Sequence, residues 1–156
     1  MTQPRTLLTL LGIAGSAGLL LGALAFQHIG GLPPCKLCYW QRYGHVAAVI
    51  LGLLALLVPQ RILLWLAALG AGSSGAVGIY HTGVERGWWE GPSTCTSGPV
   101  AGKSVDALLN DIMAAPMVRC DDIAWELASL SMASWNVLAS TVVALCFVAA
   151  ANRLRG

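Results

Sequence analysis

Two cysteines of this chain lie three residues apart, in the segment Cys35-Lys36-Leu37-Cys38, directly after Pro33-Pro34. The prolines disfavour helix ahead of Cys35 and favour a helix that starts beside it. A thiol at a helix N-terminus meets the positive end of the helix dipole, and Lys36 adds a cation, so the thiolate is favoured there. The pattern is typical of a redox-active or metal-binding pair more than of a structural disulfide.

Cys95 and Cys120 form a second group, far apart in one later segment. All four cysteines together could bind Zn²⁺, but Cys95 and Cys120 lack the short C-x2–4-C spacing of structural zinc sites, so we predict no metal. On composition alone, a disulfide that ties down an extracellular loop is the simplest interpretation of this second group. The nearby C-x-x-C is what makes a redox role a serious alternative.

Arg42 follows Cys38 by four residues, which places it on the same face of the expected helix and one turn further along. At a membrane edge, an arginine either extends its charge to the interface or contacts a ligand. The residues alone leave both interpretations open.

The elements that position these groups are predicted from hydropathy. Of 156 residues, 56% are hydrophobic and 10% are charged, where a soluble domain has roughly 25% charged residues. The composition predicts an all-α membrane protein, a single domain over residues 1–156 whose helices pack inside a lipid bilayer. Four transmembrane spans are expected, at about residues 6–26, 43–58, 62–80 and 135–151. The net charge of +2 without a basic stripe argues against a nucleic-acid partner.

Basic residues set the expected orientation. Four arginines and no acidic residues occupy the two tails and the short turn after the second span: Arg5, Arg61, Arg153 and Arg155. This side, with both termini, is therefore predicted to be cytoplasmic. The loops 27–42 and 81–134 then face outward, and four of the five cysteines lie in an oxidising compartment. A cleaved signal peptide is the alternative for the first segment, which follows Arg5 and contains Ala23-Leu24-Ala25, but its apolar run is long for one.

Small residues and one amphipathic segment add detail to this bundle. Gly18 and Gly22 are spaced for close helix packing, as are the small residues of 70–75. In the second outward loop, Ser104 to Ala114 carries Val105, Leu108, Leu109, Ile112 and Met113 with helical periodicity. The segment predicts a short amphipathic helix that lies on the membrane surface or packs against the cysteine segments.

Three histidines, His28, His45 and His81, lie near the outer ends of the spans. Histidine pairs that hold haem between helices would make the chain a membrane electron carrier, but this alternative leaves four outward cysteines unexplained. Cys146, in the middle of the fourth span, is expected to be a small packing residue.

Taken together, the chain resembles the DsbB family of bacterial inner-membrane disulfide-bond formation proteins over essentially its whole length. The resemblance is carried by residues in a fixed order along the four spans: Phe26-Gln27-His28, Pro34-Cys35-Lys36-Leu37-Cys38-Tyr39-Trp40-Gln41-Arg42, Tyr80-His81, Thr94-Cys95, Cys120, Trp125, Met132 and Trp135. Lys36 and Gln41 occupy positions that vary in the family, and Cys146 is outside its pattern.

The resemblance implies a disulfide-generating protein-dithiol:quinone oxidoreductase. It would reoxidise a periplasmic, thioredoxin-fold, DsbA-like oxidase and pass electrons to ubiquinone or menaquinone in the inner membrane. It also implies redox-active disulfides Cys35–Cys38 and Cys95–Cys120 and a transient Cys35–Cys120 disulfide. Cys95 matches the site of attack by the partner, and Cys38 matches the residue beside the quinone.

The resemblance assigns four residues to the quinone site: Arg42, Cys38, His81 and Met132. A cation at Arg42 would stabilise negative charge on a quinone oxygen. The non-enzymatic alternative is a four-span membrane protein whose loop disulfides are purely structural, and the C-x-x-C at a helix start argues against it.

Overall fold

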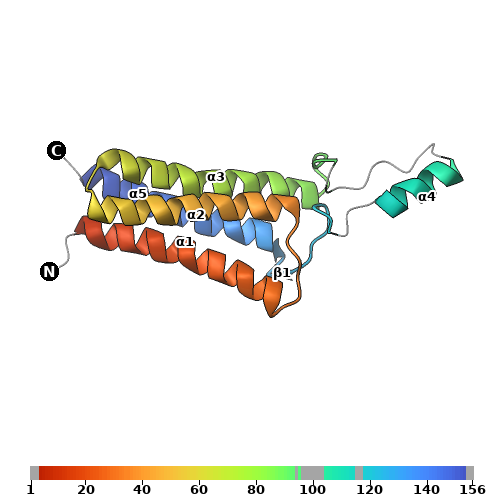
Figure 1. The fold of residues 1–156 in the computed structure, drawn as a ribbon, viewed down its shortest axis with the longest axis horizontal. Helices are drawn as coiled ribbons and strands as arrows, with labels where there is room; N and C mark the ends of the chain where they lie inside the picture. The colour runs from red at the N-terminus through yellow and green to blue at the C-terminus, as the bar shows by residue number, and fades with distance from the viewer. Residues whose placement is uncertain (1–3, 94, 96–103, 115–117, 154–156) are drawn as a thin grey trace.

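The computed structural model describes residues 4–93, 95, 104–114 and 118–153. In it, four helices are long and apolar enough to cross a membrane, which confirms the predicted all-α architecture: α1 (Pro4–His28), α2 (Lys36–Leu57), α3 (Arg61–Glu85) and α5 (Met132–Arg153). They run side by side as one bundle, with both ends of the chain at the same end of it (Figure 1). The short helix α4 (Val105–Ala114) and the strands β1 (Glu126–Leu127) and β2 (Leu130–Ser131) belong to the connection between α3 and α5.

The helices extend beyond the predicted spans wherever polar residues continue the helix. Helix α2 begins at Lys36 rather than near residue 43, because Pro33-Pro34 and the N-cap Cys35 fix its start. Helix α3 continues past Tyr80 to Glu85. It ends in a Schellman motif, in which the N–H of Trp88 donates to the Gly83 carbonyl at 2.8 Å and Gly87 adopts a φ of 68°. His81 and Glu85 are therefore helical residues, and not loop residues.

Close helix packing depends on particular glycines. A Cβ at Gly44 of α2 would lie 2.6 Å from the Gly70 carbonyl oxygen of α3, so these two backbones touch. Gly12 of α1 likewise accommodates the fully buried Phe147 ring of α5. The expectation for Gly18 and Gly22 was wrong, because no heavy atom lies within 4 Å of a Cβ built at either one.

The connection between α3 and α5 ends in a tight hairpin. Strands β1 and β2 pair antiparallel, and the turn residues Ala128 and Ser129 both have positive φ, as a type I′ turn requires. The Trp135 indole N–H donates to the Leu127 carbonyl at 3.1 Å, which ties the hairpin to the start of α5.

Helix α4 forms where the sequence pattern places it and lies beyond the end of the bundle that is opposite the termini (Figure 1). Of its expected apolar stripe, Val105, Leu109 and Met113 are exposed, whereas the side chains of Leu108 and Ile112 lie outside the described residues. Docking of α4 on a membrane surface therefore stays a prediction.

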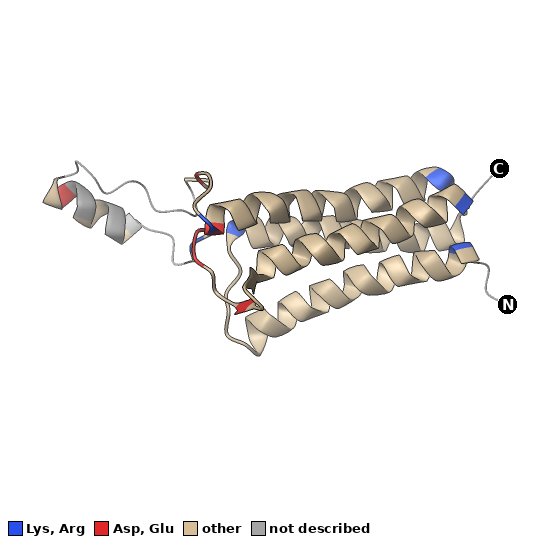
Figure 2. Cartoon of the chain, turned by 180° about the vertical axis from the view of Figure 1, so that it is seen from behind, with Lys and Arg blue, Asp and Glu red and all other residues tan. Residues whose placement is uncertain are grey.

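Charge is divided between the two ends of the bundle (Figure 2). Lysine and arginine without acidic residues mark the end at which the termini lie, and acidic residues gather at the opposite end, together with other basic ones. Arg5, Arg61 and Arg153 belong to the first of these ends, whereas Arg155 lies outside the described residues. This distribution agrees with the charge pattern used to predict the orientation.

Candidate redox site

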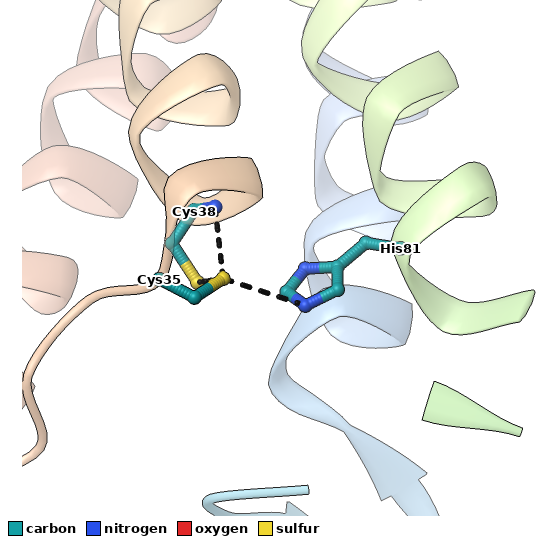
Figure 3. A group of neighbouring side chains, drawn as sticks. All are labelled: Cys35, Cys38 and His81. Carbon is teal, nitrogen blue, oxygen red and sulfur yellow. Dashed lines mark hydrogen bonds between the residues drawn. The ribbon is translucent and has the colours of Figure 1, made fainter. Parts of the chain in front are cut away.

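The start of α2 brings the C-x-x-C pair against a histidine of α3 (Figure 3). Cys35 and Cys38 are unbonded thiols with their sulfurs 3.1 Å apart. The Cys35 sulfur also accepts a hydrogen bond from the Cys38 backbone N–H at 3.3 Å, and it lies 3.6 Å from His81 Nε2. Cys35 is 5% exposed. A helix N-terminus, a second thiol and an imidazole thus converge on one buried sulfur.

Cys35 is the sulfur of the pair that carries negative charge. A hydrogen bond from the Cys38 thiol and the contact with His81 outweigh desolvation by burial and lower the pKa of Cys35 from 9.0 to about 4. Because three donors face Cys35, the thiolate is its predominant form at neutral pH. The direction of this shift agrees with the thiolate expected at the helix start.

Two side-chain amides, those of Gln41 and Asn136, fix the orientation of His81. The Gln41 side-chain Nε2 donates to the Leu37 carbonyl at 3.3 Å and lies 3.0 Å from His81 Nδ1. The Gln41 carbonyl oxygen in turn accepts from Asn136 Nδ2 at 2.8 Å. Since Leu37 offers only an acceptor, the Gln41 NH₂ group must face His81 Nδ1, and the imidazole proton therefore lies on Nε2, directed at Cys35.

The second cysteine pair is a disulfide, Cys95–Cys120, with the Cα atoms 5.4 Å apart. Both cysteines are almost fully buried, and they form one apolar cluster with Cys35, Leu37 and Val84. The disulfide therefore lies beside the C-x-x-C pair, although the cysteines come from distant segments.

The zinc alternative can be compared with this geometry. The four-cysteine site is not formed, because Cys95 and Cys120 are bonded to each other. The ligand atoms of Cys35, Cys38 and His81 do lie within 4.8 Å of one another. They are three ligand atoms, whereas a structural zinc site has four, and the absence of metal stays a prediction.

A cavity of about 410 Å³ opens beside the C-x-x-C pair, lined by residues of α1, α2, α3 and α5 and of the segment that precedes α5. Its size falls within the usual range for small-molecule sites. It brings together most of the predicted site residues with the two glycines that do not pack: Gly18, Gly22, Cys35, Cys38, Arg42, His81, Met132 and Trp135. The absence of side chains at Gly18 and Gly22 leaves room in the cavity on the α1 side.

Arg42 lines the cavity and also joins α2 to α1. Its guanidinium donates to the Gln27 side-chain oxygen at 2.6 Å and to the Ala23 carbonyl at 3.1 Å, and it lies over the Tyr39 ring. Arg42 thus ties α2 to the last turns of α1 while its charge remains at the cavity wall.

The haem alternative is not supported by the histidines. His28 is exposed at the end of α1, whereas His45 and His81 are buried. The His45 ring nitrogens contact Ser16 on one side and Asn136 and Ser140 on the other. Both nitrogens of each buried histidine thus have protein partners, which argues against axial haem ligation.

Cys146 is a partly buried free thiol in the middle of α5, whereas the C-x-x-C pair is at the start of α2. It is not among the residues that line the cavity. Its position agrees with a packing role.

Sequence reasoning missed Glu85, Gln41 and Asn136 as parts of the site. Glu85 appeared to be a loop residue, although its spacing of four from His81 would have indicated a shared helical face had α3 been extended. No local pattern marks Asn136, which comes from α5 and contacts Gln41 only through the fold.

The comparison with protein families agrees with this geometry. A family model described as "Disulfide bond formation protein DsbB" matches residues 5–150. The chain belongs to the DsbB family. DsbB relatives include Disulfide bond formation protein B of Pasteurella multocida strain Pm70, 33% identical, with 90% of this chain and 85% of that protein covered. The protein of the same name from Aeromonas hydrophila is 34% identical, with 87% and 83% covered. Disulfide bond formation protein B 2 of Pseudomonas aeruginosa PAO1 is 33% identical, with 81% and 78% covered. No solved structure matches the chain.

Membership of the DsbB family makes the chain a multi-pass membrane protein of disulfide bond formation. Of the residues that carry the resemblance, Phe26 and Trp125 pack with ring centroids 5.1 Å apart at the cavity. Thr94 lies outside the described residues.

Proposed function

We propose that this chain is a protein-dithiol:quinone oxidoreductase that reoxidises a periplasmic, thioredoxin-fold, DsbA-like oxidase and passes the electrons to membrane quinone. The observation that carries the proposal is the shared burial of a thiolate-forming C-x-x-C and a closed disulfide beside one cavity. Disulfide exchange needs a thiolate that attacks and a leaving thiol of low pKa. Cys35 is such a leaving thiol, because its pKa is lowered to about 4.

In the proposed exchange, a partner thiolate attacks Cys95, so that a partner–Cys95 disulfide forms and Cys120 leaves as a thiolate. Cys120 then attacks the Cys35–Cys38 disulfide at Cys35 and releases Cys38. The second thiol of the partner next displaces Cys95 and leaves with a disulfide. Finally, Cys95 attacks Cys120 and releases Cys35, whose low pKa makes it a good leaving group. Two electrons have moved from the partner to the Cys35/Cys38 pair.

The cavity fits a quinone ring by its size and its mostly apolar walls. Arg42, His81 and Met132 would hold the ring beside Cys38. When bound, quinone supplies a two-electron, two-proton acceptor. Arg42 contributes a fixed cation whose orientation is maintained by Gln27 and Ala23.

The proposed location is the bacterial inner membrane, with both termini cytoplasmic and both cysteine pairs at the periplasmic side. The acid-free arginine end of the bundle supports this orientation (Figure 2). An oxidising periplasm would maintain the Cys95–Cys120 disulfide between turnovers.

The test is a quinone-reduction assay with purified protein, a reduced DsbA-like dithiol protein and either ubiquinone or menaquinone. We expect quinone absorbance to fall, Cys38→Ser to abolish the fall, and the matched control Cys146→Ser to leave it unchanged. Absence of quinone consumption, or consumption that survives Cys38→Ser, would refute the proposal and favour purely structural disulfides.

The order of exchange has a separate test. A partner whose second thiol is replaced by serine cannot displace Cys95, so a partner–Cys95 mixed disulfide should accumulate with the wild-type chain on a non-reducing gel. A mixed disulfide through Cys35 instead would contradict the proposed order.

A further inference from the structure

One buried carboxylate in the site has no role in the exchange described above. The Glu85 side chain is 5% exposed, and its Oε2 has no hydrogen-bond partner. Its other oxygen, Oε1, lies 3.8 Å from His81 Nε2. Glu85 also lines the cavity beside the C-x-x-C pair. A buried ionised carboxylate whose stabilising neighbours are the Ser131 hydroxyl and His81 is costly, so its protonation state depends on these neighbours.

His81 offers a single proton to two anionic acceptors, with the Cys120 backbone carbonyl as a neutral third acceptor. Gln41 donates to Nδ1, so only Nε2 carries hydrogen, and that nitrogen faces both Cys35 at 3.6 Å and Glu85 at 3.8 Å. One neutral N–H cannot satisfy a thiolate and a carboxylate at the same time. Two negative charges on either side of an uncharged imidazole would also repel each other in a buried site.

Other charged groups near Glu85 already have partners. Arg86, the next residue of the chain, donates to the Ser129 carbonyl at 2.7 Å and is exposed. Across the cavity, Arg119 pairs with Asp121 at 2.7 Å, and Arg42 donates to α1. Asp122, which also lines the cavity, is exposed and adds negative charge. Among the charged groups of the described residues, His81 is therefore the one most directly placed to stabilise an ionised Glu85, beside the neutral Ser131 hydroxyl, which also donates to it.

We propose that Glu85 takes up a proton when the Cys35–Cys38 disulfide is reduced and releases it when the disulfide re-forms. In the oxidised protein, the His81 N–H faces an ionised Glu85. In the reduced protein, it faces the Cys35 thiolate, and Glu85 is a neutral acid. Glu85 thus keeps the negative charge of the site at one while the cysteines change redox state.

The balance of the step is complete with a dithiol as reductant. The dithiol supplies two electrons and two protons and becomes a disulfide. The Cys35–Cys38 bond breaks, Cys35 becomes a thiolate, Cys38 becomes a thiol with one proton, and Glu85 becomes a carboxylic acid with the other. Re-formation of the disulfide returns two electrons and two protons, which is what a quinone requires. The proposal deepens the proposed function in this respect, and the proton uptake itself needs neither quinone nor partner.

The test is the redox equilibrium of Cys35–Cys38 with dithiothreitol between about pH 5.5 and 7.5, below the usual pKa of a free thiol. Full-length protein in detergent is equilibrated anaerobically, quenched with acid and alkylated, and the Cys35/Cys38 peptide is quantified by mass spectrometry. Dithiothreitol releases two protons on oxidation. If the wild-type protein takes up two, its equilibrium constant is independent of pH.

The Glu85→Gln variant is expected to take up only one proton, so its equilibrium constant for reduction should rise about tenfold per pH unit. The matched control Glu126→Gln, an exposed acid on β1, should behave as wild type. The proposal is overturned if Glu85→Gln is also independent of pH, or if the wild type already shows the tenfold rise. Neither result depends on whether quinone reduction is observed.

A second measurement applies to the wild-type protein even if Glu85→Gln does not fold. A reduced-minus-oxidised infrared difference spectrum should show a protonated-carboxyl C=O band that Glu126→Gln retains and Glu85→Asp shifts. Absence of that band in the wild type, or an unshifted band in Glu85→Asp, would contradict proton uptake at Glu85.

Discussion

Removal of the imidazole of His81 should raise the pKa of Cys35. The Cys35 sulfur lies 3.6 Å from His81 Nε2, and this contact is one of the causes that lower its pKa to about 4. A hydrogen bond to a charged group contributes roughly 1.5–3 kcal/mol. At about 1.4 kcal/mol per pKa unit, His81→Phe should raise the pKa by one to two units, to about 5–6. The Cys38 backbone N–H and thiol remain as donors and prevent a full return to 9.0.

The assay is the rate of iodoacetamide alkylation of Cys35 in reduced protein as a function of pH. Iodoacetamide reacts with the thiolate, so the alkylation rate follows the fraction of Cys35 that is ionised. The lowered pKa also makes the stability of the reduced protein depend on pH: the stabilisation is complete above the ordinary thiol pKa of 9.0 and is lost as the pH falls towards 4. The wild-type rate should therefore reach half its plateau near pH 4 and the His81→Phe rate near about pH 5–6. His28→Phe, at an exposed histidine, is the control. An unchanged midpoint in His81→Phe would refute the assigned role of the imidazole.

The same substitution should also make the cysteine pair a weaker oxidant. Stabilisation of a thiolate favours the reduced pair, and about 30 mV corresponds to tenfold in the equilibrium constant of a two-electron couple. A loss of one to two pKa units therefore predicts a potential lower by roughly 30–60 mV. Equilibration with glutathione at fixed pH measures this shift.

Three further predictions follow from the cavity and the bundle. Arg42→Met should raise the KM for quinone at least about tenfold, because a charged hydrogen bond contributes roughly 1.5–3 kcal/mol; steady-state kinetics with varied quinone measures this, and an unchanged KM would remove Arg42 from the site. Gly44→Val should destabilise the bundle by about 1–3 kcal/mol through its clash with the Gly70 carbonyl, a loss visible as a lower Tm in detergent. Cys146→Ala should leave both the Tm and the exchange rates within about 0.5 kcal/mol of wild type; a larger fall in the exchange rate would mean that this thiol takes part.

The four spans and the start of α2 at the C-x-x-C pair were predictable because their determinants are local. Apolar runs of membrane length identify the four helices, and two prolines followed by Cys35 identify the start of α2 without any tertiary information. The helix ends were less accurate, because an apolar run stops at the first charged residue, whereas α3 stops only where Gly87 can adopt a positive φ.

The parts of the site that could not be predicted are those made by contacts across the bundle. Asn136 orients Gln41, which in turn orients His81, and the three residues come from α5, α2 and α3. Gln41 and Asn136 each look like an ordinary polar residue in their own segments. Glu85 was missed for the same reason, since its burial depends on the neighbouring hairpin and cysteine cluster rather than on its own sequence context. The cavity likewise depends on Gly18 and Gly22, whose spacing predicted packing.

Both cysteine pairs and Glu85 lie at the end of the bundle opposite the termini. This placement determines whether the reaction works against the membrane potential. If the electrons and protons exchanged by these residues enter and leave near one membrane surface, no charge has to cross the full hydrocarbon thickness. Moving one charge across that thickness costs roughly 2.3 kcal/mol per 100 mV of membrane potential. The proposed reaction should therefore be electroneutral with respect to the bilayer, and its rate in proteoliposomes should be indifferent to an imposed diffusion potential.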